Sequence, residues 1–287
     1  MSKILLIDTM NFAHRARAGF GEGDHSIIFN FFRNLRALIE LIKPDEVMMI
    51  LEGHPKARHE AHPEYKANRR LDEASPGYDA KRAAMIDFHR QIDAALFLIK
   101  STFPIQVVRH PDHECDDVLA YWARRYANAQ HDVVVASSDT DFIQLLHPLY
   151  SRISLYNPMR KEWIVAPLYP YLTWKALKGD SSDNISGIKG CGEKTASRLA
   201  SDPKLLEAYL SDPQKLLIWE RNVSLIEFHE LSIEDLDAME RWFQPVPDWD
   251  TVHKDFEARG FTSIINPKSW AKFTTTFEAA VTRTQAL

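Results

Sequence analysis

Carboxylates lie in three tight clusters along this chain of 287 residues. Each cluster places two or three acids within four residues, and two further acids close apolar runs. Because carboxylates at such spacing repel one another, the pattern is typical of a site that binds cations. Oxygen ligands without matching histidine or cysteine favour Mg²⁺ or Mn²⁺ over zinc. The acids that we predict as metal ligands are Asp8, Glu52, Glu114, Asp116, Asp117, Asp139, Asp141, Asp180 and Asp183.

Each cluster also has an ordinary explanation. Acids in a first helical turn, as in Glu114–Asp117, interact favourably with the helix dipole, and Asp180 with Asp183 could be a helix cap and its loop. The dipole explains three acids in four residues poorly, and the Asp139–Asp141 pair ends a separate apolar run. Taken together, the clusters favour a metal site. Two divalent ions about 4 Å apart can clamp a phosphodiester, one activating water and one stabilising the leaving oxygen.

A glycine-rich segment follows the last acidic cluster. It lacks the Gly-Lys-Ser/Thr of a Walker loop, and also the third glycine and preceding strand of a dinucleotide fingerprint. What remains is a hairpin between two helices, whose amide groups can bind a backbone phosphate without reading bases. A plain helix–helix turn, the alternative, rarely needs three glycines in six residues. The residues predicted to contact nucleic acid here are Gly187, Lys189, Gly190, Gly192 and Lys194.

The segment from His54 to Tyr78 is basic and proline-containing and lacks a long apolar stripe. This composition predicts a projecting or mobile insertion. Within it, Lys66 and Arg69 share a face if the stretch is helical. With Tyr65 beside them and Arg70 within reach, that face suits a phosphate backbone with an unstacked base. A solvated run of charge is the alternative, and on these residues alone it is the better interpretation.

Four short apolar runs predict buried strands, and helical periodicity lies between them. Strands that alternate with helices favour an α/β fold with a mostly parallel sheet covered on both faces. Ligand sites of such sheets lie beyond the carboxyl ends of the strands, where Asp8, Glu52 and Asp139 are expected. After about Pro167 short helices replace the strands. The predicted strands are Ile4–Ile7, Val47–Leu51, Ile105–Val108 and Val133–Ala136, and the predicted helices cover 28–39, 86–99, 117–126, 171–177, 193–200, 203–210 and 213–219.

Composition narrows the class of protein. Hydrophobic residues make up 45% of the chain, enough for a sizeable core, and the net charge of -5 means that nucleic-acid contacts must come from local basic patches. The two cysteines form no disulfide framework. No apolar run reaches the roughly 18 residues of a membrane span, and the N-terminal run is too short for a signal peptide. We therefore expect a soluble, cytoplasmic protein. No histidine pair accompanies the acidic clusters, and His113 is a candidate only for an outer contact.

These motifs, in this order, resemble the 5′-nuclease family, which includes flap endonucleases, phage 5′-exonucleases and the 5′-nuclease domain of bacterial DNA polymerase I. The resemblance covers roughly Lys3 to Glu230. Glu52 departs from the family pattern, which usually has aspartate near the end of the second strand. The matching motifs are Ile7-Asp8-Thr9-x-Asn11, Tyr65-Lys66-x-x-Arg69, Glu114-x-Asp116-Asp117, Ser138-Asp139-x-Asp141 and Gly179-Asp180-x-x-Asp183-Asn184-Ile185-x-Gly187-x-x-Gly190-x-Gly192.

The resemblance implies a PIN-like nuclease domain at 1–166 with a clamp or arch at about 54–90, a helix–three-turn–helix region at 167–245, and a C-terminal segment at 246–287 that packs on the core. It implies that Lys66 and Arg69 contact the scissile phosphate, and that the Gly187–Gly192 hairpin holds duplex DNA, with K⁺ bound there. One Mg²⁺ or Mn²⁺ would lie among Asp8, Glu52, Glu114 and Asp116, and a second among Asp117, Asp139, Asp141, Asp180 and Asp183.

The implied activity is metal-dependent hydrolysis of DNA at 5′ flaps and 5′ ends by a monomer that acts on branched or 5′-ended DNA in replication and repair. Because the chain leaves no room for a polymerase, a stand-alone nuclease of phage or small bacterial type is expected. Two other classes stay open. A non-catalytic junction-binding protein would not need intact carboxylates, and an RNA-directed PIN-type ribonuclease would not need the glycine hairpin.

Overall fold

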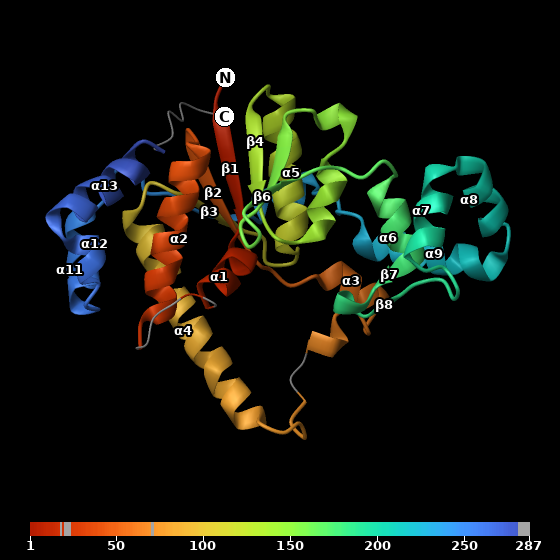
Figure 1. Cartoon of the computed structure of the whole chain (residues 1–287), viewed down its shortest axis with the longest axis horizontal. Coiled ribbons are helices and arrows are strands. Elements are labelled where there is room, and N and C mark those ends of the chain that lie inside the picture. The colour runs from red at the N-terminus through yellow and green to blue at the C-terminus, as the bar shows by residue number, and fades with distance from the viewer. Residues whose placement is uncertain (18, 20–23, 70–71, 281–287) are drawn as a thin grey trace.

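A mostly parallel sheet runs through the middle of the molecule, with helices on both faces (Figure 1). The structure, a computed structural model, describes residues 1–17, 19, 24–69 and 72–280. Within them the strand order is β6-β5-β4-β1-β2-β3-β9, and only the edge strands β6 and β9 run antiparallel to their neighbours. The strands are β1 Lys3–Asp8, β2 Glu46–Leu51, β3 Gln106–Arg109, β4 Asp132–Ala136, β5 Ile153–Asn157, β6 Glu162–Ile164 and β9 Glu240–Trp242.

The central strands are apolar on both faces because both faces are covered. In β1, Leu5 and Ile7 join one core cluster, whereas Ile4 and Leu6 join the other. The first cluster lies under α1 (Thr9–Arg17), α2 (Ser26–Ile42) and the C-terminal half of α4 (Tyr78–Thr102), and the second lies under α5 (Cys115–Asn128). The α/β fold class predicted from the sequence is thereby confirmed. The four predicted strands are all present, and β5, β6 and β9 were not predicted.

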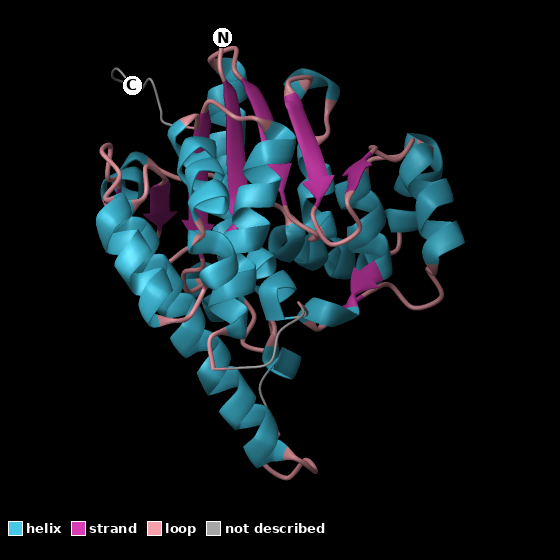
Figure 2. Cartoon of the chain, turned by 60° about the vertical axis from the view of Figure 1, so that its left-hand side comes forward, coloured by secondary structure: helices cyan, strands magenta, loops and turns pink. Residues whose placement is uncertain are grey.

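An arch leaves the sheet after β2. It contains α3 (Lys56–Ala61), the 3₁₀ helix η1 (Ala67–Arg69) and the first turns of α4, which project well beyond the body of the molecule (Figure 2). Residues 79–86 of α4 are exposed, whereas from Phe88 onward the helix buries an apolar stripe on the sheet. Most of the described residues before Tyr78 in the arch are likewise exposed or half-buried, which explains why that part of the sequence has no apolar stripe.

A compact group of helices follows the last parallel strand. It comprises α6 (Tyr171–Lys178), α7 (Glu193–Ser201), α8 (Pro203–Leu210) and α9 (Pro213–Ile226), with the short hairpin of β7 (Gly179–Asp180) and β8 (Ile185–Ser186) and the 3₁₀ helix η4 (Ser181–Asp183). Asp202 and Asp212 cap α8 and α9, each followed by proline in the first turn. The group has its own apolar core around Trp174, Leu177 and Leu199.

The C-terminal part returns to the sheet. It contains α10 (Ile233–Asp237), β9, α11 (Trp249–Ala258), α12 (Thr262–Ile265) and α13 (Pro267–Glu278). Phe256, Phe273 and Phe277 pack on Phe103 and on the α2 side of the core. These helices bury their aromatic side chains and expose their other faces. Apolar and polar residues are therefore mixed along the C-terminal part of the sequence. Within the described chain, no helix is both long and apolar enough to cross a bilayer.

Candidate metal centre and nucleic-acid interface

The sheet-edge group of carboxylates consists of Asp8, Glu52, Asp116 and Asp139. Asp8 ends β1, Glu52 follows β2, and Asp139 follows β4. Since these three strands are parallel neighbours, their carboxyl ends meet at one edge. Asp116 comes to the same edge from the first turn of α5. The Glu52 carboxylate accepts a hydrogen bond from the Cys115 amide at 3.4 Å, which places it beside that turn.

Small polar side chains hold this group in place. The Ser137 hydroxyl donates to Asp8 Oδ2 at 2.9 Å and accepts from the Asp139 amide at 3.0 Å. Asn11 Oδ1 accepts two hydrogen bonds from Ser138, both at 2.9 Å. The ends of β1 and β4 are therefore tied together by side chains, one of which, Ser137, donates directly to the Asp8 carboxylate. This cross-strand arrangement explains the sequence motifs around Asn11 and Ser138.

The electrostatics of the sheet-edge group call for an external cation. Burial raises the pKa of Asp8 to about 6, and the nearby charge of Asp139 adds to the effect. Glu52 retains solvent contact, yet desolvation and the charge of Glu114 raise its pKa to about 7. The pKa of Asp116 is raised by burial and then by Asp139 and Asp8. In the described part of the chain no ion pair joins any member of the group to lysine or arginine. Such an oxygen-rich donor set fits Mg²⁺ or Mn²⁺.

The paired group of carboxylates lies on the side of the helical region. Its members are Glu114, Asp141, Asp180 and Asp183, and ligand atoms of the three aspartates lie within 4.8 Å of one another. Lys175 on α6 forms ion pairs with Asp141 and, at 2.7 Å, with Asp180 Oδ2. Burial alone would raise the pKa of Asp180, but its bonds with Lys175 lower it to about 2. This group also fits a divalent ion, which would compete with the ammonium group.

Lys175 is a residue that sequence reasoning missed. It lies among the apolar residues of α6, with Trp174 and Leu177 in the core beside it, and is itself 5% exposed. Although burial alone would lower the pKa of Lys175, the charge of Asp141 raises it above its usual range. The available signal was a lysine on the helix that leads into the Asp180 cluster. A buried lysine cannot be told from an exposed one by that spacing alone.

The base of the arch supplies two further cations. Lys66 forms an ion pair with Glu114 and approaches Asp183 Oδ2 at 3.9 Å, and Arg69 pairs with Asp183. The Lys66 backbone amide donates to the Asp183 carbonyl at 3.0 Å, and its φ of 56° lies in the left-handed region. The structure thus places Lys66 and Arg69 beside the carboxylates, and their predicted contact with the scissile phosphate stays a prediction. Arg70 lies outside the described residues.

Two predicted residues lie elsewhere than expected. Tyr65 is 4% exposed, and its hydroxyl donates to Glu114 Oε2 at 3.0 Å, so its ring is not available to stack on a base. Asp117 points away from the cleft, since successive residues of a helix face different sides. Arg58 holds both its oxygens, at 2.6 and 2.8 Å, and the His229 amide donates to it at 2.8 Å. Asp117 is therefore held in a buried ion pair, and its predicted role as a metal ligand stays a prediction.

The glycine hairpin joins β8 to α7 and lies at the surface. Gly187 packs against the end of α6, where a side chain would meet the Lys178 carbonyl oxygen at 1.9 Å. Gly190 has a φ of 80° and, like Gly192, has open space where a side chain would be. Lys189 and Lys194 are exposed beside them. The first glycine thus serves packing, whereas the other four predicted residues present backbone and positive charge to solvent.

Comparisons with known proteins place these features in a family. Residues 3–168 match the signature described as 5′-3′ exonuclease, N-terminal resolvase-like domain. The chain is 30% identical to the thermostable DNA polymerase I of Thermus thermophilus over 221 residues, which is 71% of this chain and 24% of that protein. It is 33% identical to DNA polymerase I of Treponema pallidum (strain Nichols) over 185 residues, covering 61% and 17%. The chain thus spans a quarter or less of the length of these relatives.

Solved structures share the whole fold. The T5 D15 protein co-crystallized with metal ions superposes with a TM-score of 0.64 at 18% identity, covering 97% of this chain and 99% of that chain. T5 5′-exonuclease with bound divalent zinc ions has a TM-score of 0.66 at 19% identity and the same coverage. Human GEN1 in complex with Holliday junction DNA has a TM-score of 0.56 at 14% identity, covering 96% and 72%. At these identities the likeness concerns the fold.

Proposed function

Because this chain belongs to the family of 5′-3′ exonuclease N-terminal, resolvase-like domains, we propose that it is a metal-dependent, structure-specific 5′-nuclease acting on DNA, with flap endonuclease and 5′→3′ exonuclease activity. Its family membership confirms the resemblance predicted from the motifs. The observation that carries the proposal is the convergence of eight carboxylates, from separate segments of the chain, on the base of a basic arch. The substrates are branched or 5′-ended DNA, and the reaction is hydrolysis of a phosphodiester.

Two divalent ions, Mg²⁺ or Mn²⁺, are proposed for the cleft. Bound there, they supply an activated water and a counter-charge for the leaving oxygen. Oxygen ligands for one ion come from Asp8, Glu52, Glu114 and Asp116. Asp139, Asp141, Asp180 and Asp183 offer ligands for the other. The raised pKa values of Asp8 and Glu52 support this assignment, because desolvation and neighbouring carboxylates disfavour their ionised forms and a divalent charge would favour them.

Lys66 and Arg69 act on the phosphate in this proposal. They are paired with Glu114 and Asp183. Both cations therefore lie beside carboxylates that would hold an ion, where they can also face a scissile phosphate. There they stabilise charge that develops on its oxygens during hydrolysis. Arg69 is the more exposed of the two, with a side-chain exposure of 54% against 14% for Lys66, which suits it to the first contact with DNA.

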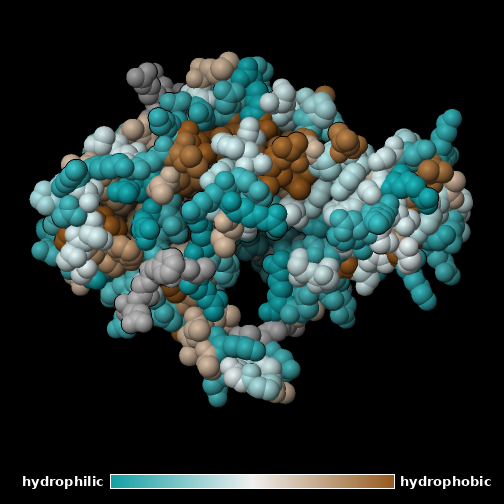
Figure 3. Space-filling model, viewed as in Figure 1, coloured by the Kyte–Doolittle hydropathy of each residue, from teal (hydrophilic) through white to brown (hydrophobic). Residues whose placement is uncertain are grey.

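The arch bounds an opening that suits a single strand. The space-filling view shows an opening between the arch and the body of the molecule (Figure 3). The exposed glycine hairpin lies on the helical region, where it can hold the duplex next to a 5′ end. We propose that its backbone contacts phosphate there, with K⁺ bound at Gly187–Gly192. Two buried free cysteines suit a reducing compartment such as the cytoplasm, where we propose that the protein acts as a monomer.

Cleavage assays test the function directly. Substrates with 5′-labelled flaps, nicks and single strands are incubated in Mg²⁺ or in EDTA, with Asp139→Asn as the matched inactive variant. We expect cleavage at flaps and 5′ ends in Mg²⁺ alone. A protein that binds junctions in Mg²⁺ without cutting them would be the non-catalytic binding protein. Cleavage confined to RNA would identify the ribonuclease alternative.

Substitutions at Glu52 test whether this glutamate binds metal in place of the aspartate that is usual in the family. If Glu52 is a ligand, Glu52→Gln should lower the cleavage rate strongly and raise the Mg²⁺ concentration needed for half-maximal rate. Glu52→Asp should retain part of the rate, because it keeps the charge on a shorter side chain. Two variants that match the wild type across the Mg²⁺ titration would remove Glu52 from the metal site.

A further inference from the structure

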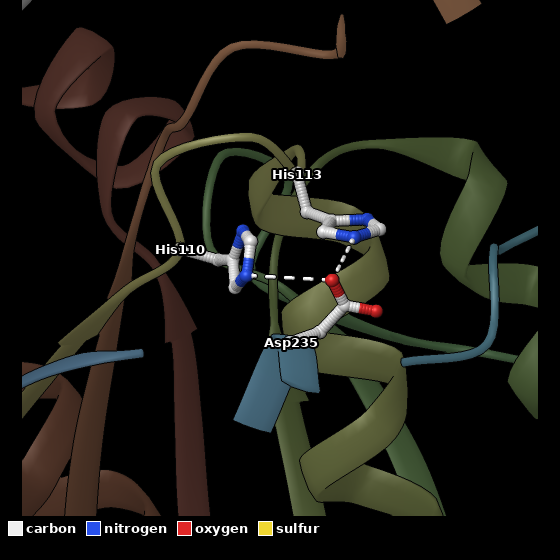
Figure 4. A group of neighbouring side chains, drawn as sticks. All are labelled: His110, His113 and Asp235. Carbon is white, nitrogen blue, oxygen red and sulfur yellow. Dashed lines mark ion pairs between the residues drawn. The ribbon is translucent and has the colours of Figure 1, made fainter. Parts of the chain in front are cut away.

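A second cluster of possible ligands lies outside the acidic cleft. His110 and His113 belong to the loop between β3 and α5, and Asp235 belongs to α10, far along the chain. Figure 4 shows both imidazole rings directed at one carboxylate oxygen of Asp235. That oxygen, Oδ1, lies 3.7 Å from His110 Nε2 and 3.3 Å from His113 Nε2. One ligand atom from each of the three residues lies within 4.8 Å of the others.

The spacing suits a tetrahedral ion. Two donors about 2.0–2.1 Å from a zinc ion, at the tetrahedral angle, lie about 3.3 Å apart. The two nitrogen–oxygen distances, 3.3 and 3.7 Å, are close to that edge length. Two imidazoles and one carboxylate are also the donor set of open, three-ligand zinc sites. The site therefore differs in chemistry from the cleft, where all the predicted ligands are oxygens.

An unpartnered buried nitrogen points to a missing ligand. His110 is 2% exposed, and its Nε2 atom has no hydrogen-bond partner within the described structure. A buried polar atom of this kind calls for an explanation such as an absent ion. Asp235 is free to bind through Oδ1, because its other oxygen accepts from the Ser232 amide in the cap of α10.

Neighbouring groups orient the second ring. His113 Nδ1 lies 3.7 Å from Asp117 Oδ2, so a carboxylate backs the imidazole on the side away from Asp235. Ligating histidines typically have such a carboxylate, which fixes the tautomer with Nε2 toward the metal. Binding of an ion through His110 requires a change of tautomer in its imidazole ring. Its Nδ1 accepts from the Asp112 amide at 3.1 Å, and coordination through Nε2 moves the ring proton to Nδ1. The Asp112 amide would lose this hydrogen bond.

We propose that His110, His113 and Asp235 bind one transition-metal ion of the zinc class, with water as the fourth ligand. The ion would join the loop before α5 to α10. Glu114, a member of the paired group, directly follows His113 in the chain. The site would therefore anchor the loop that presents a cleft carboxylate, without itself contacting substrate. It does not depend on the nuclease activity proposed above.

Zinc titration with the cleft weakened by substitution and occupied by excess Mg²⁺ tests the site. The 287-residue chain carrying Asp139→Asn is titrated with Zn²⁺ by calorimetry, and with Co²⁺ by visible absorption, in excess Mg²⁺. We expect one tight equivalent of Zn²⁺ and intense Co²⁺ bands typical of tetrahedral nitrogen ligation. Adding His110→Gln or His113→Gln should weaken binding at least about 100-fold. Adding His89→Gln, an exposed histidine on α4, should change nothing.

The variants also separate binding from folding. Circular dichroism and thermal unfolding show whether each variant is folded. If either histidine variant unfolds, Asp235→Asn takes its place, because asparagine can still accept the Ser232 hydrogen bond while losing the ligand charge. No saturable Zn²⁺ binding in Mg²⁺, or binding that the folded cluster variants leave unchanged, would overturn the site.

Discussion

The two groups of carboxylates in the cleft balance their charge in different ways. The sheet-edge group has no lysine or arginine paired to it in the described chain, and desolvation raises the pKa values of Asp8, Glu52 and Asp116. The paired group is held by Lys66, Arg69 and Lys175, although burial still raises the pKa of its member Asp141 to about 7. A region that lacks internal cations depends on an external ion, whereas one that contains them can keep its structure without metal. The difference separates residues that bind the ion most strongly from residues that also stabilise the fold.

Replacing one acid in each group should separate them most sharply. Asp116→Asn should reduce cleavage by about 1,000-fold or more, equivalent to about 4 kcal/mol of barrier, while raising the melting temperature in EDTA because repulsion is relieved. Asp180→Asn should lower the melting temperature, because Lys175 loses a partner. Cleavage assays and thermal unfolding in EDTA give both readouts. Melting shifts of the same sign would show that the two groups are electrostatically alike.

The buried ion pair between Arg58 and Asp117 should contribute strongly to the free energy of unfolding. Arg58→Met leaves the Asp117 carboxylate buried without its partner and should cost about 3–5 kcal/mol of unfolding free energy. Arg90→Met, which breaks an exposed pair with Asp87 on α4, is the matched control and should cost less than about 1 kcal/mol. Urea denaturation measures both. If the two variants lose equal stability, the Arg58–Asp117 pair is not the structural contact described here.

Lys66 should act on rate more than on binding. Lys66→Ala should slow single-turnover cleavage about 100-fold, because a donor aimed at developing charge is lost. Binding of a flap substrate in Ca²⁺ should change only a few-fold. Lys56→Ala, an exposed lysine of α3, controls for loss of arch charge. Equal losses in rate and binding would make Lys66 a docking residue.

The pH dependence of stability should reveal the cleft carboxylates whose pKa values are raised. The folded-state pKa values of Asp8, Glu52 and Asp141 are raised to about 6, about 7 and about 7, from 3.8, 4.5 and 3.8. Between about pH 4 and 7 the folded protein therefore binds more protons than the unfolded chain, so stability in EDTA falls as pH rises. Asp8 contributes about 1–3 kcal/mol. Saturating Mg²⁺ should abolish the fall. A melting temperature in EDTA that rises over this window would contradict the assignment.

The glycine hairpin should have the smallest effects, because its cations lack carboxylate partners in the described structure and face solvent. Lys189→Ala and Lys194→Ala should each reduce the slope of log affinity against log salt by roughly one unit. Neither should change sequence preference. Lys268→Ala on α13 is the control on the opposite side of the core. Slopes equal to that of the wild type for both hairpin variants would remove the hairpin from the DNA interface.

Local pattern predicted much of the fold but not all of it. The central strands are continuous apolar runs, so burial on both faces identifies them without any partner. The edge strands β6 and β9 are three residues each and largely exposed, and only pairing with β5 and β3 makes them strands. Helices α11–α13 have exposed faces between their aromatic residues, so their core side becomes visible only once they pack on α2 and α4.

The cleft shows what sequence determines and what it leaves to tertiary structure. Residue type and the parallel-strand pattern were enough to bring Asp8, Glu52 and Asp139 to one edge, because strand direction fixes where strand ends meet. Which way adjacent helical residues point, and which cations reach them, depends on distant segments. Asp116 faces the cleft while Asp117 meets Arg58 from the arch. Lys175 and the pairing of His110 with Asp235 likewise arise from contacts between segments far apart in the chain, which no local spacing encodes.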